Sequence, residues 1–376
     1  METSLTITSV SFRNFRNYVS LELQDLGRLV VIVGDNALGK TNIIEGLQLI
    51  SMLDSFRKPS WEDVVRQGED CAYVMAEFIQ NSQKNHVMLE IRDSKRTYRL
   101  NEKVKRNNEL VGRLPAVLFT PDDLQIIKGP AEQRRLLVDN LGCQLSRTFY
   151  DIKQDYGRTV KQKNSLLREE YVNEDLLMSW NRNLAKLGAS LMSHRVALFN
   201  RLMKRAIDIY TQIAPQETLL AEYTPSWVAV GKDENVTYDE DVDMFTLLET
   251  YHGLEMRQRR ALIGPHRDEI AFYINGKNAR QFGSQGQQRS IALALKIAEV
   301  EVLHEVMGVH PILLLDDVMS EIDEGRRTIL LKLIDTTTQT FITTTNLSYF
   351  DEETLKKAQV VSLPGDQENA HVLITQ

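Results

Sequence analysis

Hydrophobic and polar residues alternate along the first part of the chain, and this two-residue period is typical of half-buried β-strands. The strand-like segments are residues 4–15, 28–34, 72–80 and 86–93. The segment TYRLNEKVKR at residues 97–106 has the pattern of a hairpin, with Asn101 near its tip. These patterns predict that the chain begins with a β-sheet.

The middle of the chain shows the three- and four-residue spacing of amphipathic helices. Apolar residues repeat in this way over residues 137–160 and again over residues 180–213. The polar stretch between them, near residues 169–174, predicts an antiparallel helical hairpin. Both the core of a helical bundle and a protruding coiled coil fit this pattern.

The last part of the chain returns to strands. After a polar, turn-rich stretch at residues 226–240, the segment IAFYING at residues 270–276 has strand character, and a helix follows from residue 288. The apolar run PILLLDD at residues 311–317 then predicts a buried strand. The fold class predicted from these elements is α/β.

Composition and charge limit the range of possible functions. The chain has 376 residues and a formal net charge of −7, so any contact with nucleic acid must come from local clusters of Lys and Arg. The two cysteines, Cys71 and Cys143, lack metal-ligand or redox spacing and are expected to be plain core residues. No apolar run approaches the roughly 18 residues of a membrane span. We therefore expect a soluble cytoplasmic protein without membrane contact.

A phosphate loop is the strongest chemical signal. An apolar strand runs into Gly34-x-x-x-x-Gly39-Lys40-Thr41 and then into an amphipathic helix. Glycines let several backbone N–H groups face one phosphate chain, while Lys40 reaches the β- and γ-oxygens and Thr41 ligates Mg²⁺. The residues expected to hold ATP are Gly34, Asp35, Asn36, Ala37, Leu38, Gly39, Lys40, Thr41 and Asn42.

A carboxylate pair follows the buried strand at residues 311–317 and would complete the metal site. We expect Asp316 to bind Mg²⁺, through water, and Asp317 to act as general base on the attacking water. The catalytic residues predicted are therefore Asp317 and Lys40. The alternative for the acidic pair alone is a helix N-cap after a core strand.

The stretch GSQGQQRS at residues 283–290 begins the next helix. Its glycine and glutamine turn offers backbone N–H groups, a hydroxyl and the helix dipole, which together make a second anion site. The residues concerned are Ser284, Gln285, Gly286 and Gln287. Taken alone, the turn is more often a simple helix cap.

The order of phosphate loop, helical middle, SQGQQ helix and carboxylate strand resembles that of the ABC-type ATPases, whose signature turn is similar to LSGGQ. That resemblance implies a head-to-tail dimer with two ATP molecules at the interface, so that Ser284 and Gly286 would act in trans. The blocks SFRNFRNY, VLFTPDDLQIIKGPAEQRRLLVD, GPHRDEI and LLLDDVMSEID also resemble the RecF family across nearly the whole chain.

The RecF resemblance implies an SMC-like ABC-type ATPase head, lobe I, with an inserted, mainly helical lobe II. The expected boundaries are 1–115 and 262–376 for lobe I and 116–261 for lobe II. It also implies an ATP-dependent homodimer that binds double-stranded and gapped DNA and is a weak, DNA-stimulated ATPase. The implied partners are RecR, RecO and RecA, in recombinational repair and replication restart.

Two other classes share this ATP chemistry: the motor of a membrane transporter and a structural SMC-type tether. The segment between Thr41 and Ser284 is much longer than a transporter motor needs, whereas the helical middle is too short for a long tether arm. Both remain alternatives to the DNA-binding mediator.

Several positions depart from the general ABC pattern. Asp317 stands where transporters usually carry Glu, and Asp122 and Asp123 are the candidates for the contact that a glutamine makes elsewhere. Thr345 and Asn346 occupy the position of the histidine switch, to which we assign no role. His266 and Arg267 in GPHRDE fit either a chemical role or an ion-paired structural turn.

A basic cluster is the first candidate for DNA contact. Six cations lie within twelve residues of the predicted hairpin: Lys95, Arg96, Arg99, Lys103, Lys105 and Arg106. They could follow phosphates without reading bases, or form a solvated face. Further candidates for DNA contact are Arg134, Arg135, Lys161, Lys163 and Arg168. The RecF resemblance implies that Arg13 and Arg16 lie near the nucleotide base instead.

Overall fold

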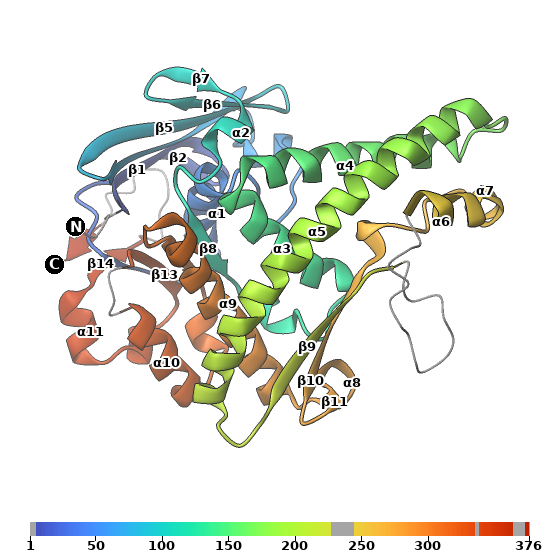
Figure 1. Cartoon of the computed structure of the whole chain (residues 1–376). Coiled ribbons are helices and arrows are strands. Elements are labelled where there is room, and N and C mark those ends of the chain that lie inside the picture. Colours follow the sequence, from blue (N-terminus) through green and yellow to red (C-terminus); the bar gives the residue numbers. More distant parts are fainter. Residues whose placement is uncertain (1–4, 227–243, 335–337, 364–372, 376) are drawn as a thin grey trace. The chain divides into compact units, whose positions relative to one another are not determined.

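The structure is a computed structural model that describes residues 5–226, 244–334, 338–363 and 373–375. The chain divides into two compact units. Unit 1 combines residues 1–125 with 292–376, and unit 2 is the continuous segment 126–291. Figure 1 follows the chain through both.

An antiparallel sheet of six strands forms one layer of unit 1, in the order β2-β1-β4-β5-β6-β7. Its strands confirm the predicted alternation, since β1 buries every second residue over most of its length. Asn101 and Glu102, both with positive φ, make the two-residue turn of the predicted hairpin. The strands are β1 (Leu5–Phe15), β2 (Tyr18–Leu23), β4 (Cys71–Gln80), β5 (Gln83–Arg92), β6 (Lys95–Leu100) and β7 (Lys103–Lys105).

A second sheet of unit 1 is parallel except at one edge, with the order β15-β14-β3-β13-β12-β8. Strands from both ends of the chain alternate in it, and β3 lies between β13 and β14. Its strands are β3 (Leu29–Val33), β8 (Ala116–Phe119), β12 (Ile312–Asp316), β13 (Thr340–Thr344), β14 (Gln359–Ser362) and β15 (Leu373–Thr375).

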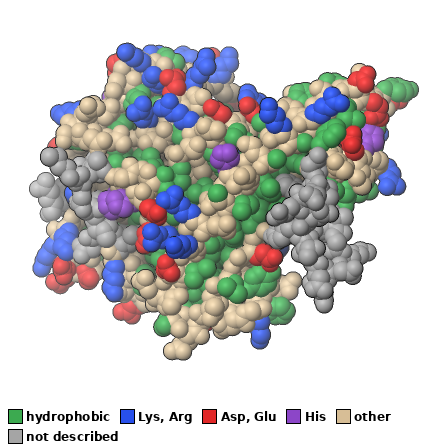
Figure 2. Space-filling view, in the orientation of Figure 1, with side chains coloured by type: hydrophobic (Ala, Val, Ile, Leu, Met, Phe, Trp, Pro, Cys, Tyr) green, Lys and Arg blue, Asp and Glu red, His purple; other side chains and the backbone are tan. Residues whose placement is uncertain are grey.

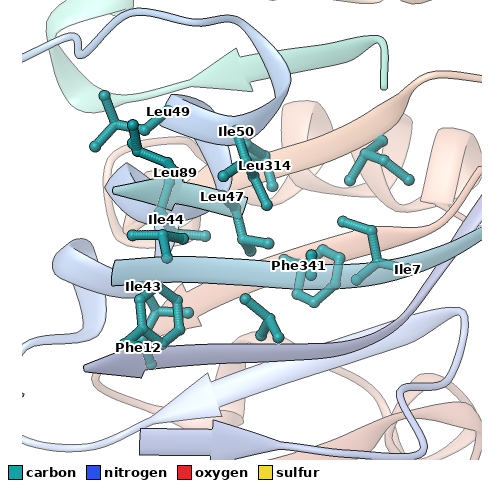
Figure 3. Packing of buried hydrophobic residues seen from close by; sticks show 14 of the residues in the cluster. Ile7, Phe12, Ile43, Ile44, Leu47, Leu49, Ile50, Leu89, Leu314 and Phe341 are labelled. Atoms are coloured by element: carbon teal, nitrogen blue, oxygen red, sulfur yellow. The ribbon is translucent and has the colours of Figure 1, made fainter. Parts of the chain in front are cut away.

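Helix α1 (Lys40–Ser51) packs between the two sheets and contacts strands of both. It is buried nearly all round, so its sequence is apolar on more than one face. Figure 3 shows Ile43, Ile44 and Leu47 packed with Phe12 of one sheet and Phe341 of the other. This core fixes the start of α1, which directly follows the phosphate loop.

The remaining helices of unit 1 are α2 (Asn107–Leu110), α10 (Glu324–Ile334) and α11 (Glu352–Lys357). Helix α9 (Gln285–Met307) begins in unit 2 and ends in unit 1. The part of the chain that the structure describes has no helix both long and apolar enough to cross a membrane. Cys71 and Cys143 form no disulfide and are half-buried, and Cys143 packs against the hydrophobic core of unit 2.

Unit 2 contains the helical hairpin, formed by α4 (Arg147–Leu166) and α5 (Glu174–Ile213). The first apolar stripe, residues 137–160, is not one helix as its spacing predicts, because α3 (Ala131–Leu145) ends within it and α4 begins at Arg147. Ser146 has extended backbone, with φ −145° and ψ 123°, and its hydroxyl accepts from Phe149 N as the N-cap of α4. The three-residue period continues across this break and conceals it.

A small antiparallel sheet with the order β11-β10-β9 completes unit 2. Its pairing decides where the unit ends, because β10 pairs with β9 and therefore stays in unit 2. Likewise, β8 pairs with β12 and lies in unit 1. The structure thus divides the chain after residues 125 and 291, beyond the expected 115 and 261. The elements are β9 (Leu219–Thr224), α6 (Met244–Thr250), α7 (His252–Gln258), β10 (Glu269–Ile274), β11 (Lys277–Asn278) and α8 (Ala279–Phe282).

Candidate nucleotide site and charged clusters

The phosphate loop joins β3 to α1 in unit 1, as its sequence predicts. Its tip, residues 35–37, is exposed, whereas Lys40 at the start of α1 is only 7% exposed. The Lys40 ammonium donates to the carbonyl oxygens of Gly34 at 2.6 Å and Asp35 at 2.8 Å. The side chain therefore curls over its own loop, where a phosphate oxygen can compete for the same donors.

Gly39 holds the tightest point of the loop, with φ +94°. A Cβ there would lie 2.5 Å from Asn17 Nδ2 and 2.7 Å from the Tyr18 hydroxyl. Only glycine tolerates both this dihedral and this approach. Asn17 also accepts from Asn42 Nδ2 at 2.6 Å, which ties the β1–β2 turn to the first turn of α1.

Glu45 is a fully buried carboxylate on α1 that gathers three donors. Arg16 binds it through two nitrogens, at 2.6 and 2.9 Å, and Ser55 donates at 2.7 Å. Arg57 donates to Glu45 at 3.1 Å and to Asn42 at 2.6 Å. Arg16 thus lies against the phosphate-loop helix, and Arg57, which no sequence pattern singled out, joins the same cluster.

Asp316 at the end of β12 meets the phosphate-loop helix, as the two motifs predict. Its Oδ1 accepts from Thr41 Oγ1 at 3.0 Å and from Thr343 Oγ1 at 2.7 Å. Burial raises the pKa of Asp316, while the two threonine hydroxyls, Arg57 and Lys40 favour its ionised form. The contact with Thr41 spans most of the chain and results from the parallel order β3-β13-β12.

Asp317 has a strained backbone, with φ +51°, immediately after β12. Its N–H donates to Thr343 Oγ1 at 3.0 Å, whereas its buried Oδ1 has no hydrogen-bond partner among the described residues. Burial raises the pKa of Asp317, and the neighbouring Asp316 adds to this, while Lys40 opposes it. A carboxylate with spare acceptor capacity and a raised pKa is suited to receive a proton.

The oxygen donors fit Mg²⁺. Among the described residues, no group of three or more His, Cys, Asp or Glu side chains could hold a metal alone. Mg²⁺, however, commonly takes one or two protein oxygens, with waters and phosphate oxygens completing its octahedron. Thr41 Oγ1 and Asp316 Oδ1, 3.0 Å apart at the phosphate loop, supply that partial set.

The signature turn lies in unit 2 and begins α9 with a reciprocal cap. Ser284 N donates to Gln287 Oε1 at 2.8 Å, and Gln287 N donates to Ser284 Oγ at 3.2 Å. Gln287 Nε2 also donates to Glu217 at 2.8 Å. Ser284 and Gln285 remain exposed, and the preceding Phe282 is 70% exposed. The turn is a helix cap that also presents an uncovered polar and aromatic surface.

Asp122 and Asp123 after β8 have different environments. Asp122 is exposed. Asp123 accepts from Thr120 N at 2.8 Å and pairs with Lys296 of α9 at 3.0 Å. Lys296 also pairs with Glu299 at 3.2 Å, and burial raises the pKa of Glu299 to about 7. Asp123 is therefore engaged in an ion-pair network.

The GPHRDE block forms a buried ion-paired turn in unit 2. Asp268 is fully buried and accepts from Ser226 N at 2.8 Å and from the Tyr223 hydroxyl. Arg195 donates to Pro265 O at 2.7 Å and lies 3.5 Å from Asp268. These contacts favour the structural interpretation of this block.

Arg195 and His266 complete this cluster. Arg195 binds Asp139 through two nitrogens, at 2.9 and 3.1 Å. His266 Nδ1 lies 2.7 Å from the Tyr156 hydroxyl, and burial lowers the pKa of His266 to about 4. His266 is therefore neutral at neutral pH and is poorly suited to donate a proton there.

The predicted basic cluster of the β6–β7 hairpin spreads over both faces of its sheet. Lys95 and Arg99 share one face of β6, whereas Arg96 points to the other, where it lies over the Trp61 ring at 4.0 Å. Lys105 pairs with Glu109 at 2.9 Å. The exposed members are Lys95, Lys103 and Arg106. Figure 2 shows Lys and Arg side chains gathered over this end of the sheet.

Three of the further DNA candidates are held inside unit 2. Arg134 is 3% exposed and donates to Glu269 at 2.7 Å, and Arg135 donates to Asp268 O at 2.5 Å. Lys163 is fully buried and pairs with Glu255 at 2.6 Å. Charge alone gave no sign of this burial. Lys161 and Arg168 are exposed.

A phosphate loop beside a carboxylate strand, in a parallel sheet fed by both ends of the chain, defines an SMC-like ABC-type ATPase head. Crystallised Smc heads share this fold: one from Pyrococcus furiosus matches with a TM-score of 0.55 at 14% identity, covering 99% of this chain and 96% of that one. The RecF/RecN/SMC N terminal domain family matches residues 6–365. The chain belongs to the RecF family.

Relatives and solved structures agree with this assignment. The DNA replication and repair proteins RecF of Acaryochloris marina and of Listeria monocytogenes are each 36% identical, over 94% of this chain and 96% of theirs. The solved structure of the recombination mediator protein RecF-ATP in the RecFOR pathway matches with a TM-score of 0.86 at 28% identity. It covers 99% of both chains.

Proposed function

We propose that this protein is an ATP-dependent DNA-binding protein of recombinational repair and replication restart, with slow, DNA-stimulated ATP hydrolysis. The observation that carries the proposal is the convergence of Lys40, Thr41, Asp316 and Asp317 at one edge of the parallel sheet. The solved RecF-ATP structure is similar over nearly the full chain, and this similarity supports ATP as the nucleotide.

In the proposed reaction, residues 34–42 hold the phosphates through backbone N–H groups, and Lys40 binds the β- and γ-oxygens. Thr41, and Asp316 through water, would hold Mg²⁺, which when bound would neutralise charge at these oxygens. The water oxygen bonds to the γ-phosphorus, the bond to the ADP oxygen breaks, and Asp317 takes the proton. Asp317 also lies near Lys40, whose charge favours its ionised form.

The proposed active form is a head-to-tail homodimer, in which residues 284–287 of one chain contact the γ-phosphate bound by the other. Two observations support this. Ser284 and Gln285 are exposed at the start of the long helix α9, whose dipole favours an anion. Phe282 beside them is 70% exposed, an unusual exposure for a large aromatic side chain that an interface would cover.

Double-stranded or gapped DNA is the proposed polyanion. The exposed cations Lys95, Lys103 and Arg106 on the β6–β7 hairpin carry this contact, as positioning contacts to phosphates rather than base readout. The proposed protein partners are RecR and, functionally, RecO and RecA. The similar solved structure is that of a RecF protein of the RecFOR pathway, which supports these partners.

The test is the mass of the purified protein in solution, by light scattering, with Mg²⁺-ATP and with or without short duplex DNA. We expect a monomer that becomes a dimer with ATP and a larger dimer fraction with DNA. An unchanged monomer under both conditions would refute the dimer and leave the signature turn as a cap alone.

Two variants locate the dimer contact. Lys40→Met should lose ATP binding and dimerisation together, because it removes the ammonium that reaches the phosphates. Ser284→Arg should bind ATP as a monomer and fail to pair. Mixed Lys40→Met and Ser284→Arg chains can still form one intact composite site, so partial dimer recovery in the mixture is expected if Ser284 acts in trans.

A further inference from the structure

Glu217 lies in the loop between helix α5 and strand β9 of unit 2 and belongs to none of the sequence motifs. Its backbone N–H donates to Ala214 O at 3.0 Å, and the next residue, Thr218, exchanges two hydrogen bonds with Asn275, at 2.8 and 2.9 Å. Figure 1 shows this loop where α5 leads into β9. The backbone is therefore held on both sides of Glu217, which gives its side chain a fixed starting point.

Both oxygens of the Glu217 carboxylate accept hydrogen bonds. The Tyr210 hydroxyl donates to Oε2, and Tyr210 is a fully buried residue on the last turn of α5. Gln287 Nε2 donates to Oε1 at 2.8 Å. Neither donor is a cation, so these contacts orient side chains rather than neutralise charge. Glu217 thus connects the end of the hairpin helix α5 with the signature turn.

The carboxylate decides which way the Gln287 amide faces. An ionised carboxylate only accepts hydrogen bonds, so the Nε2 end of the amide has to point toward Glu217. The Oε1 end then points toward Ser284 N, from which it accepts at 2.8 Å. Ser284 Oγ in turn accepts from Gln287 N at 3.2 Å. Glu217 therefore selects the one amide orientation that the cap of α9 requires.

The same contact leaves a donor available at the turn. A glutamine Nε2 carries two N–H groups, and Glu217 uses one of them. The second has no acceptor among the described residues, and Gln287 is only half-buried. It stands at the start of α9 with the exposed residues Ser284 and Gln285, where the helix dipole favours an anion. A phosphate oxygen at this turn would meet an N–H group whose position Glu217 has already set.

A carboxylate near a site for phosphate also repels that phosphate, so its place there needs a compensating gain. Ordering of Gln287 supplies one. A glutamine side chain that is already fixed loses no rotamer freedom when it binds, and this is worth about two- to tenfold in affinity for each side chain. Because the carboxylate is held by Tyr210 and by its own loop, the gain is built into the free chain.

We propose that Glu217 is a positioning residue for the ATP-dependent dimer. It orders Gln287 and Ser284 of one chain for contact with the γ-phosphate bound by the other chain, and it touches no phosphate itself. The inference rests on the proposed head-to-tail dimer and adds to it a residue from outside the motifs. Through Tyr210, Glu217 also joins the signature turn to the hairpin helix as one connected body.

The experiment measures two constants for the full chain: the Kd of ATP for the monomer at low protein concentration, and the dimer Kd with Mg²⁺-ATP by sedimentation equilibrium. Glu217→Leu should leave the ATP Kd within about twofold. Its dimer Kd should rise about four- to hundredfold, because each of two sites loses about two- to tenfold. Glu217→Gln should stay within about twofold of the wild type, since its amide can accept from Gln287 and donate to the Tyr210 oxygen.

Glu222→Leu is the matched control. Glu222 is an exposed carboxylate on the neighbouring strand β9 and accepts from the Tyr273 hydroxyl at 3.3 Å. The substitution removes the same charge and a similar contact without touching the signature turn, so both constants should stay within about twofold. If Glu217→Leu does not fold, Glu217→Ala gives the same test.

A double-mutant cycle separates positioning from a general structural role. If Glu217 acts through Gln287, then Glu217→Leu should cause no further change in the dimer Kd of Gln287→Leu chains. Additive losses would mean that Glu217 supports the dimer by another route and would overturn the proposal.

The remaining outcomes are also decisive. An unchanged or tighter dimer with Glu217→Leu, in a wild type that does dimerise, would overturn this inference alone and leave the dimer standing. Weaker ATP binding by the Glu217→Leu monomer would show an effect outside the turn and would also count against it. A wild type that stays monomeric with Mg²⁺-ATP would refute the dimer itself, and the positioning role with it.

Discussion

The phosphate-loop site of unit 1 and the buried charged cluster of unit 2 use similar residues in opposite ways. All three guanidinium nitrogens of Arg195 donate hydrogen bonds. Asp268 accepts from a tyrosine hydroxyl and a backbone N–H. At the phosphate-loop site, Asp317 has a buried oxygen without a donor among the described residues and a backbone with positive φ.

The difference separates a structural role from a chemical one. A fully paired buried network rigidifies its surroundings and has no acceptor left for a substrate. Spare acceptor capacity and backbone strain are retained where a reaction needs them. The GPHRDE block and the Asp316–Asp317 pair are both rich in charged residues. Their hydrogen-bond and ion-pair partners distinguish them.

The largest expected effect comes from Asp317→Asn. Asparagine keeps the shape and tolerates positive φ but cannot accept the proton, so we expect ATP hydrolysis to fall by about 10²–10⁴-fold. ATP binding should persist and the DNA-bound dimer should accumulate. Phosphate release under single-turnover conditions and ATP affinity measure the two properties; rapid dissociation of the ATP dimer would argue against Asp317 as base.

The same variant has a pH signature. The folded-state pKa of Asp317 is raised, so the wild type loses stability as pH rises through that pKa, whereas asparagine does not. The stability difference should therefore favour Asp317→Asn more at pH 7 than at pH 3, which lies below the ordinary aspartate pKa near 3.8. Denaturant unfolding at both pH values measures it.

Arg195→Leu is expected to cost about 3–5 kcal/mol of stability in unit 2, because it leaves Asp139 and Asp268 as buried carboxylates without their cation. Lys204→Leu, at an exposed position of the same helix, is the matched control and should change stability by about 0.5 kcal/mol or less. Urea unfolding compares them. A small loss from Arg195→Leu would contradict the structural role.

His266 should make unit 2 sensitive to acid. Its folded-state pKa is about 4, below the ordinary value near 6.5, so the stability that it contributes is complete above pH 6.5 and is lost as pH falls toward 4. The loss amounts to at most about 3 kcal/mol. His266→Asn should remove this dependence, while His194→Asn, at an exposed position, should keep it.

The smallest expected effect is that of Ser284→Ala, which removes the cap of α9 and should destabilise the first turn by about 1 kcal/mol. Hydrogen exchange of the amides of residues 286–288 measures this locally. Ser284→Asn restores a capping oxygen and should recover most of the protection. Equal exchange in all three proteins would mean that the cap contributes nothing there.

The sequence predicted the elements better than their limits. Strand alternation and the Asn101 turn follow from local periodicity, and the structure confirms both. The break at Ser146 was missed because α3 and α4 preserve one hydrophobic period across it. The unit boundaries depend on β8 and β10 pairing with distant strands, which local patterns do not encode.

The same limit applies to the charged residues. The encounter of Thr41 with Asp316 follows from two motifs that belong together. Thr343 and Arg57 carry no motif and reach the site only through the sheet order and the Glu45 cluster. Arg134 and Lys163 look like surface cations in sequence, because the acids that bury them lie roughly a hundred residues away.

Strands from the two ends of the chain alternate in the parallel sheet, and this order affects folding during translation. Strand β3 emerges from the ribosome early, but both of its neighbours, β13 and β14, lie beyond residue 339. Unit 2 is continuous and is complete once residue 291 has been made. During translation its helices can therefore form first, and the phosphate loop can meet Asp316 and Asp317 in the parallel sheet only after β13 and β14 have been made.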